Sequence, residues 1–287
     1  MKSAKKSTSR GQQQRSGSRV AIVGCGNIGA AILGALARSS NVGKANVIAC
    51  DVDSERLEAF QQELGVAITT EPREAAELAD TVILAVKPKH VRDALIGMKG
   101  GLSSQKVLLS VAAGWPIEEL RRLVGKSVKV GRVMPNFAVG VGLGMSCVFA
   151  EDVEVARRAE ELFSATGMVY QLGAEAEIDA VTGLSASGIA FVFAMLEGLQ
   201  DGGLLAGLPR EAAQLIAAQT ALGAAGMVLD TGLSPSALKE SVVTPAGTTI
   251  AGLMELETKG VRAAFANAVN AATERARAIG KSIQRTK

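Results

Sequence analysis

The chain has 287 residues, 48% of them hydrophobic, which is long enough for about two domains with sizeable cores. Its net charge of +3 is unevenly placed: residues 1–19 hold six basic and no acidic side chains, so the other 268 residues carry −3 and predict no nucleic-acid surface. The single histidine, His90, and three cysteines without paired spacing (Cys25, Cys50 and Cys147) disfavour a metal site or a histidine-activated nucleophile, and predict reduced core thiols in a cytoplasmic protein.

Residues 1–18 form a basic segment rich in Ser and Gln and nearly devoid of apolar side chains. Such a segment buries too little apolar surface to order itself, and it lacks the apolar core of a signal peptide and the apolar face of an import helix. We expect a disordered tail or a remnant of an expression vector, with a targeting or contact role as the alternative.

The first predicted strand, Val20–Val23, runs directly into Gly24-Cys-Gly26-Asn-Ile-Gly29, and an Ala- and Leu-rich helical pattern follows over residues 27–38. This order is the dinucleotide fingerprint: Gly24 permits the tight turn, Gly26 lets the backbone approach a pyrophosphate, and Gly29 lets the helix pack against the strand. The N–H groups at the helix start would hold the pyrophosphate. A purely structural glycine turn is the alternative.

Asp51 ends the second predicted strand, Val47–Cys50, and lies 22 residues after Gly29. An acidic residue at this place accepts hydrogen bonds from the adenosine ribose and repels a 2′-phosphate, which favours NADH over NADPH. Asp51 or Asp53 can equally cap the helix that starts near Ser54, and the two roles are compatible.

Strands and helices continue to alternate as far as residue 172. The further strands are expected at Thr81–Val86, Val107–Val111, Val128–Met134, 145–149 and 168–172, and the helices near 54–64, 72–79, 89–97, 116–124 and 152–166. This alternation predicts an α/β domain over residues 19–172, with a doubly wound, mostly parallel sheet of the Rossmann type that binds its ligand at the carboxyl ends of the strands.

Three strand ends are expected to face the cofactor cleft. In Ala85-Val-Lys-Pro88, Pro88 fixes the turn and Lys87 lies near phosphate or ribose, unless it is merely a solvated loop lysine. Ser110-Val-Ala-Ala-Gly114 offers small residues on which a flat ring can lie. In Met134-Pro-Asn136, the asparagine either binds the ligand or holds a turn.

Residues 173–287 read as helical throughout, near 176–206, 210–230, 234–243, 248–259 and 261–283. The 17-residue uncharged run Ala180–Leu196 is short for a membrane span, so we expect a buried helix and no membrane. Helices this apolar would expose large hydrophobic faces in a single copy. We predict an all-helical substrate-binding and dimerisation domain in which two chains intertwine, with a self-contained helical cap as the alternative.

The segment Thr244-Pro-Ala-Gly-Thr-Thr249 opens one of these helices. Its backbone N–H groups and threonine hydroxyls make a suitable cradle for a carboxylate. An ordinary helix cap followed by proline in the first turn is the alternative.

From residue 19 onward the chain resembles the pyrroline-5-carboxylate reductase family. The resemblance rests on the order and spacing of five motifs, at Ile22–Gly29, Ala85–Pro88, Ser110–Gly114, Met134–Asn136 and Leu238–Ile250. It implies hydride transfer from NAD(P)H to the C=N bond of 1-pyrroline-5-carboxylate, giving L-proline. It also implies a homodimer with interlocked helical domains, and such dimers can assemble into a larger ring.

The resemblance further implies residue roles. The Thr249 hydroxyl would face the ring nitrogen as the catalytic group, Thr244 would help to hold the carboxylate, and the N–H groups of Gly247, Thr248 and Thr249 would complete the cradle. The implied cofactor-binding residues are Gly24, Cys25, Gly26, Asn27, Ile28, Gly29, Asp51, Ala85, Val86, Lys87, Pro88 and Ala112. The imine nitrogen is readily protonated, so orientation of the two rings carries most of the catalysis and no strong general acid is needed.

The chain departs from the family pattern near the expected substrate pocket. Phe137 begins a Phe-Ala-Val segment where Thr-Pro-Ala is usual, and Ala186 and Ile189 replace a glycine and a proline. Ala246 also replaces a glycine and would be strained if its φ is positive. Two alternatives therefore stay open: a reductase of another imine or keto acid, or an inactive nucleotide-binding homologue, against which the retained Thr249 argues.

Overall fold

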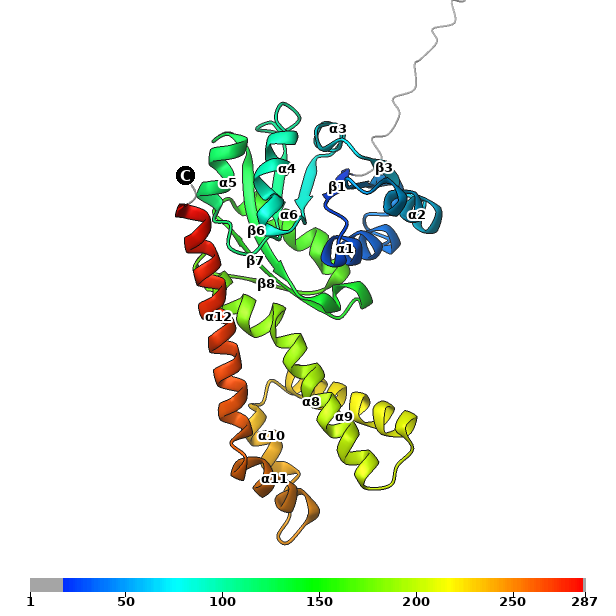
Figure 1. Cartoon of the computed structure of the whole chain (residues 1–287), viewed down its shortest axis with the longest axis vertical. Helices are drawn as coiled ribbons and strands as arrows, with labels where there is room; N and C mark the ends of the chain where they lie inside the picture. The colour runs from blue at the N-terminus through cyan, green and yellow to red at the C-terminus, as the bar shows by residue number, and fades with distance from the viewer. Residues whose placement is uncertain (1–17, 286–287) are drawn as a thin grey trace, which may run out of the picture.

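A computed structural model describes residues 18–285 and places them in an α/β domain and an elongated helical domain (Figure 1). The chain passes from one domain to the other over residues 172–176, between the last strand and the next helix. The tail predicted over residues 1–18 lies outside the described residues except for Ser18.

Within residues 18–285, eight strands form one sheet in the order β3-β2-β1-β4-β5-β6-β7-β8. The strands are β1 (Val20–Val23), β2 (Val47–Cys50), β3 (Ala67–Thr69), β4 (Thr81–Leu84), β5 (Val107–Ser110), β6 (Lys129–Pro135), β7 (Gly144–Ala150) and β8 (Gly167–Gln171). All neighbours in this sheet pair in parallel except β6 and β7, which are antiparallel. The predicted Rossmann-type, mostly parallel sheet is confirmed.

Helices cover both faces of the sheet. They are α1 (Asn27–Arg38), α2 (Ser54–Leu64), α3 (Pro72–Leu78), α4 (Val91–Gly97), α5 (Ile117–Val124) and α6 (Val153–Phe163), with short 3-10 turns at Lys44–Asn46, Pro88–His90, Phe137–Val141 and Ser164–Thr166. One core cluster packs Leu33 of α1 and Phe163 of α6 on the sheet, and a second packs Leu95 of α4 and Leu120 of α5 on the other face. Because both faces of the sheet are covered, side chains on either side of the central strands are buried, which explains why these strands are nearly continuous apolar runs.

The sequence prediction of this domain differs from the structure at short elements. The strand β3 was not predicted, because three half-exposed residues at a sheet edge leave no readable alternation. The strand predicted to reach Val86 ends at Leu84, and the helix predicted over residues 89–97 begins as the 3-10 turn Pro88–His90. These differences change the loops beside the cleft and leave the order of the main elements intact.

The helical domain contains one long helix that returns to the sheet. Its elements are α7 (Glu177–Val181), a π-helical turn (Thr182–Ala186), α8 (Gly188–Leu205), α9 (Arg210–Thr231), α10 (Pro235–Ser241), α11 (Thr248–Thr258) and α12 (Val261–Arg285). The helix α12 runs from α11 to the side of α5 (Figure 1). A Cβ on Gly183 of the π-helical turn would overlap the Thr273 hydroxyl, so this glycine lets the turn pack closely on α12.

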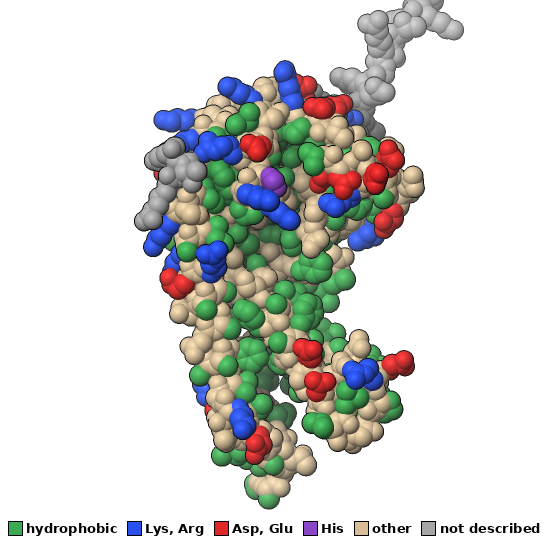
Figure 2. Space-filling model, in the orientation of Figure 1, with side chains coloured by type: hydrophobic (Ala, Val, Ile, Leu, Met, Phe, Trp, Pro, Cys, Tyr) green, Lys and Arg blue, Asp and Glu red, His purple; other side chains and the backbone are tan. Residues whose placement is uncertain are grey.

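The helices of this domain expose large apolar side chains, which Figure 2 shows along the lower half of the molecule. The segments Glu177–Leu205 and Arg210–Thr231 are long and apolar enough to cross a membrane, and only 17% and 11% of their apolar windows are buried. The prediction that Ala180–Leu196 is a buried helix is therefore wrong for a single copy. A single copy thus leaves these apolar faces exposed.

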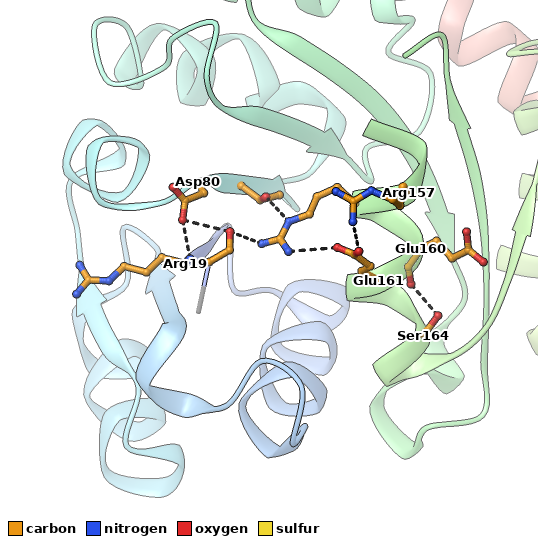
Figure 3. Close-up of polar contacts among 9 residues, drawn as sticks. Arg19, Asp80, Arg157, Glu160, Glu161 and Ser164 are labelled. Atoms are coloured by element: carbon orange, nitrogen blue, oxygen red, sulfur yellow. Dashed lines mark hydrogen bonds and ion pairs between the residues drawn. The ribbon is translucent and has the colours of Figure 1, made fainter. Parts of the chain in front are cut away.

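A polar network fastens the start of the described chain to the amino ends of the strands (Figure 3). The Asp80 carboxylate accepts hydrogen bonds from the backbone N–H of Arg19 at 2.9 Å and from the Ser18 hydroxyl at 3.1 Å. Arg158 of α6 donates to the Thr81 hydroxyl at 3.0 Å and also to Ser18. Ser18, which the sequence placed in the tail, thus contacts the α/β domain at the sheet edge opposite the cleft.

Candidate active site

A cleft of about 560 Å³ opens at the carboxyl ends of β1, β2 and β4. In this sheet the chain winds outward in opposite directions from β1 and β4, which is the switch point where open α/β sheets bind ligands. The residues predicted for cofactor binding that line it are Gly24, Gly26, Asp51, Ala85, Val86 and Lys87. The structure therefore brings together residues from three separate strand ends.

The three glycines of the first turn meet three different constraints. Gly24 has φ +95°, and a Cβ there would lie 2.7 Å from the backbone nitrogen of Val86. A Cβ on Gly29 would overlap the Gly24 carbonyl oxygen. Gly26 has an ordinary φ of −69°, and a Cβ there would meet no atom of residues 18–285 within 4 Å. Neither the backbone conformation of Gly26 nor its neighbours require a glycine, and the residue lines the cleft.

The two acidic residues after β2 have separate roles. Asp53 caps α2 by accepting a hydrogen bond from the backbone N–H of Arg56 at 3.1 Å. Asp51 accepts from the backbone N–H of Cys25 at 2.6 Å and from that of Asp53 at 3.1 Å, and it lines the cleft. The capping role therefore belongs to Asp53, and Asp51 joins the glycine turn to the end of β2.

Several cleft residues were missed by the sequence analysis, among them Arg56, Thr70, His90 and Asp93. Arg56 pairs with Asp53 at 3.4 Å, and its Nη1 lies 3.5 Å from the Cys25 carbonyl oxygen. His90 lies in the 3-10 turn that follows Lys87. Thr70 directly follows β3, and the other three lie within the first turns of the element after a strand end, which was the available signal.

The cysteine at the glycine turn is a core residue. Burial, followed by the Asp51 charge, raises the pKa of the Cys25 thiol to about 12, and the same two causes raise the pKa of Cys50 to about 12. All three cysteines lie within the described residues, and each is a buried free thiol, as predicted. The Cys25 side chain is therefore protonated at neutral pH, and its contribution to a cofactor site is its backbone.

The other predicted cofactor residues lie at the margins of the cleft. Asn27 and Ile28 begin α1, and Pro88 begins the 3-10 turn after Lys87. Ala112 is buried beyond the end of β5 and is absent from the cleft lining within the described residues. The loop that carries it is joined to the cleft, because the indole N–H of Trp115 donates to the Pro88 carbonyl at 2.9 Å.

Asn136 holds the turn after β6 and links it to the helical domain. Its Oδ1 accepts hydrogen bonds from the backbone N–H groups of Ala138 at 3.2 Å and Met145 at 3.3 Å. Its Nδ2 donates to the Ser185 hydroxyl of the π-helical turn at 3.3 Å. The neighbouring Phe137 is 52% exposed, so the two segments that depart from the family pattern meet at this point.

The substrate loop predicted at Thr244–Thr249 has the backbone of a helix cap. Gly247 is the cap of α11, its N–H donates to the Thr244 carbonyl at 3.1 Å, and a Cβ on it would overlap the Thr244 hydroxyl. Ala246 has φ +57°, and every other non-glycine residue among residues 18–285 has a negative φ. The strain expected at Ala246 is therefore present.

The cleft and the substrate loop lie far apart in one copy. The loop between α10 and α11 is at the end of the helical domain remote from the sheet (Figure 1). The predicted site residues therefore fall into two separate groups. The predicted cofactor-binding residues lie in the α/β domain, and the predicted substrate-binding residues lie at the far end of the helical domain.

Comparisons with known proteins match both domains. A family model described as pyrroline-5-carboxylate reductase dimerisation matches residues 175–279, and one described as NADP oxidoreductase, coenzyme F420-dependent, matches residues 19–114. The pyrroline-5-carboxylate reductase of Methanosarcina acetivorans is 40% identical over 266 residues, covering 92% of this chain and 98% of its own. That of Arabidopsis thaliana is 40% identical over 273 residues, covering 92% of this chain and 96% of its own.

Solved structures agree over the same length. The pyrroline-5-carboxylate reductase of Coxiella burnetii superposes with a TM-score of 0.83 at 31% identity, covering 91% of this chain and 98% of that one. The pyrroline carboxylate reductase of Plasmodium falciparum, solved with NADP bound, superposes with a TM-score of 0.82 at 28% identity, covering 92% and 98%.

Proposed function

This chain belongs to the pyrroline-5-carboxylate reductase family, and we propose that it reduces the C=N bond of 1-pyrroline-5-carboxylate with NAD(P)H, giving L-proline. The observation that carries the proposal is the open face of Gly26, whose missing side chain neither its φ nor its neighbours require. The helix-opening loop Thr244–Thr249 supports the same reaction from the other end of the chain.

We propose one orientation for the cofactor in the cleft. The backbone from Cys25 to Gly29 would hold the pyrophosphate at the start of α1, and Asp51 the adenosine ribose. The nicotinamide end would continue past β4, along Ala85–Pro88, toward Ala112. When bound there, the nicotinamide supplies the hydride.

We propose NADH as the preferred cofactor. The Asp51 carboxylate is held by two backbone N–H groups at the ribose end, where a 2′-phosphate would meet its charge. Arg56 is the nearby group that could favour NADPH, but Asp53 already neutralises it at 3.4 Å. Asp51→Ser should shift the ratio of NADPH to NADH activity toward NADPH, and an unchanged ratio would remove Asp51 from the ribose site.

The site is completed by a second copy. The separation of cleft and loop within one chain, together with the exposed apolar faces of α8 and α9, supports a homodimer through the helical domain. In that dimer the substrate loop of one copy would meet the cofactor cleft of the other. Assembly of dimers into a larger ring is part of the proposal, and sedimentation measurements test it.

The chemistry needs few polar groups. We propose that the first N–H groups of α11, at Thr248 and Thr249, and the Thr244 hydroxyl bind the substrate carboxylate. The N–H of Gly247, which was also predicted for this cradle, already donates to the Thr244 carbonyl at 3.1 Å. The Thr249 hydroxyl would orient the ring nitrogen or relay its proton. Since a protonated imine is already electrophilic, fixing the two rings face to face supplies most of the rate enhancement, up to roughly 7–11 kcal/mol.

A second candidate function is reduction of another cyclic imine. The exposed Phe137 lies beside the hydrogen bond between Asn136 and Ser185, in the two segments that differ from the family pattern. Replacement of the usual residues by Phe137, Ala186 and Ile189 would reshape the pocket wall without touching the cofactor cleft.

We propose a cytoplasmic, soluble enzyme that binds neither membrane nor nucleic acid. The two apolar segments that could span a membrane by length fall within the region that matches the dimerisation family. Contact with a second copy therefore accounts for their exposure without lipid.

The deciding experiment is to follow the loss of nicotinamide absorbance with purified protein, NADH or NADPH, and 1-pyrroline-5-carboxylate. Rapid oxidation that depends on this imine is the expected result. Cofactor binding without turnover on it, followed by turnover on a different imine, would replace the first candidate by the second.

A further inference from the structure

The last turns of α12 pack directly on the loop between β5 and α5, beside which α12 ends in Figure 1. Gly114 of this loop has φ +77°. A Cβ on Gly114 would lie 2.8 Å from Cγ2 of Ile279, 3.1 Å from the backbone nitrogen of Gly280 and 3.2 Å from Cδ1 of Ile283. The end of the helix therefore leaves no room for a side chain at residue 114.

The approach is backbone against backbone. A Cβ on Gly280 would lie 3.5 Å from the Gly114 carbonyl oxygen and 3.7 Å from its Cα, which is ordinary contact distance. A methyl group thus fits at residue 280, and a longer side chain does not. The position of the helix is fixed one and two turns earlier, where Thr273 and Ala276 are buried.

The loop that α12 contacts is connected to the cofactor cleft. Its Trp115 is buried and donates to the Pro88 carbonyl at 2.9 Å, directly after the cleft residue Lys87. At the other end of the loop, the backbone N–H of Ala112 donates to the Ser110 hydroxyl at 3.3 Å. A displacement at Gly114 would therefore move both loops on which the nicotinamide end would rest.

We propose that Ile279 and Gly280 are positioning residues for the nicotinamide end of the cofactor, acting through Gly114 and Trp115. The inference rests on the proposed function, because it assumes a dinucleotide in the cleft. The adenosine end, at Asp51, lies on the far side of β1 from this contact. The end of α12 consequently controls the orientation of one half of the cofactor and leaves the other half alone.

The test compares Gly280→Leu with Lys281→Leu, which adds the same side chain at an exposed position of the same helical turn, as the matched control. Dissociation constants are measured for NADH and for ADP-ribose, which lacks the nicotinamide, together with kcat and the midpoint of thermal unfolding. We expect Gly280→Leu to weaken NADH binding and to lower kcat by about 10- to 100-fold, while ADP-ribose binding stays within about twofold. Lys281→Leu should match the unaltered protein in both dissociation constants and in kcat.

Equal weakening of NADH and ADP-ribose, or no change in either, would overturn the proposal. If Gly280→Leu does not fold, Ile279→Ala removes the contact without adding bulk and must show the same selective loss in smaller degree. Failure of the unaltered protein to bind NADH or NADPH would instead count against the proposed function, so the two failures are distinguishable.

Discussion

Gly26 separates ligand binding from folding at a single residue. Because its φ is −69° and its side-chain direction is open, Gly26→Val should lower the unfolding free energy only by about 1 kcal/mol or less, through the poorer helix cap, while lowering the affinity for NADH by at least about tenfold through contact with the pyrophosphate. Gly29→Ala should do the reverse, lowering the unfolding free energy by about 1–3 kcal/mol, because its Cβ would overlap the Gly24 carbonyl. Cofactor titration and thermal unfolding of both variants decide this, and unchanged NADH binding in Gly26→Val would contradict it.

In the substrate loop, Ala246 and Gly247 are neighbours whose substitution should affect stability and activity, respectively. Ala246→Gly removes left-handed strain worth roughly 1–2 kcal/mol and adds about 0.4–1 kcal/mol of unfolded-state entropy, so the unfolding free energy should rise by about 1 kcal/mol or less. Gly247→Ala places a Cβ on the Thr244 hydroxyl and should lower kcat/KM for the imine at least about tenfold through a distorted cradle. Steady-state kinetics with denaturant unfolding measure both effects, and full activity of Gly247→Ala would argue against the cradle.

In the proposed site, Thr249 acts through its side-chain hydroxyl, whereas Thr248 acts through its backbone N–H. Thr249→Ala removes the hydroxyl that we place at the ring nitrogen and should lower kcat by about 10- to 100-fold, with the dissociation constant for NADH within about twofold. Thr248→Ala keeps the backbone N–H that we assign to the carboxylate, so its kinetics should stay close to those of the unaltered protein. Similar losses of kcat in the two variants would show that any substitution in the first turn of α11 disturbs the loop, and would contradict a specific role for the Thr249 hydroxyl.

Single residues were predictable from the sequence where the backbone dictates the residue type. The roles of Gly24 and Gly29 followed from spacing alone, and so did the placement of Asp51 at a strand end. The division of labour between Asp51 and Asp53 did not, because both can cap a helix and only geometry separates them. Arg56 and His90 were missed because surface helices carry such side chains for many reasons.

Among the elements, length decided what the sequence could reveal. Strands such as β1 and β4 are fully buried apolar runs and were predicted, whereas β3 has three partly exposed residues at the sheet edge. The π-helical turn Thr182–Ala186 was read as ordinary helix, since one inserted residue does not disturb an Ala- and Gly-rich pattern. This turn brings Ser185 to Asn136, so the missed detail lies where the two domains touch.

An ion pair with a buried arginine lies at the joint between the domains. Arg132 of β6, whose side chain is 6% exposed, pairs with Glu175 at 3.0 Å, and Glu175 also accepts from the backbone N–H of Ile117 at the start of α5 at 2.8 Å. Glu175→Gln keeps the acceptor but leaves the arginine charge buried without compensation, and should lower the unfolding free energy by about 3 kcal/mol.

The matched control is Glu177→Gln, two residues further on, where the side chain is exposed and the change should stay within about 0.5 kcal/mol. Denaturant unfolding of both variants checks the expectation. Equal stability of the two would mean that solvent compensates the charge of Arg132 and that other contacts, such as that of Asn136 with Ser185, hold the joint.

At the scale of the whole molecule, the sequence predicted that the helical domain needs a partner but could not show where the site lies. Apolar composition predicts exposed faces, and α8 and α9 do expose them. The distance between the cleft and the loop between α10 and α11 depends on how α12 and α8 project from the sheet (Figure 1). Such projection is a tertiary property without a local sequence pattern.

The separation of cleft and loop leads to a complementation prediction. When NADH is limiting, Gly26→Val should strongly depress every site that uses its cleft, and Thr249→Ala every site that uses its loop. If each site combines the cleft of one copy with the loop of the other, a mixed dimer of the two variants has one site with both changes and one with neither. Since random pairing makes half of the dimers mixed, about a quarter of the unaltered activity should return on co-expression.

The opposite arrangement gives a clearly different result. If each copy used its own loop, every site in the mixed dimer would carry one of the two changes, and activity would stay at the level of the separate variants. Co-expression of differently tagged chains, purification through both tags and assay with NADH and 1-pyrroline-5-carboxylate distinguish the two, because the doubly tagged dimer should then show about half of the unaltered activity per dimer. Recovery near that value requires that the partner's Thr249 serve this chain's cleft, which gives the exposed helices of Figure 2 a catalytic reason to associate.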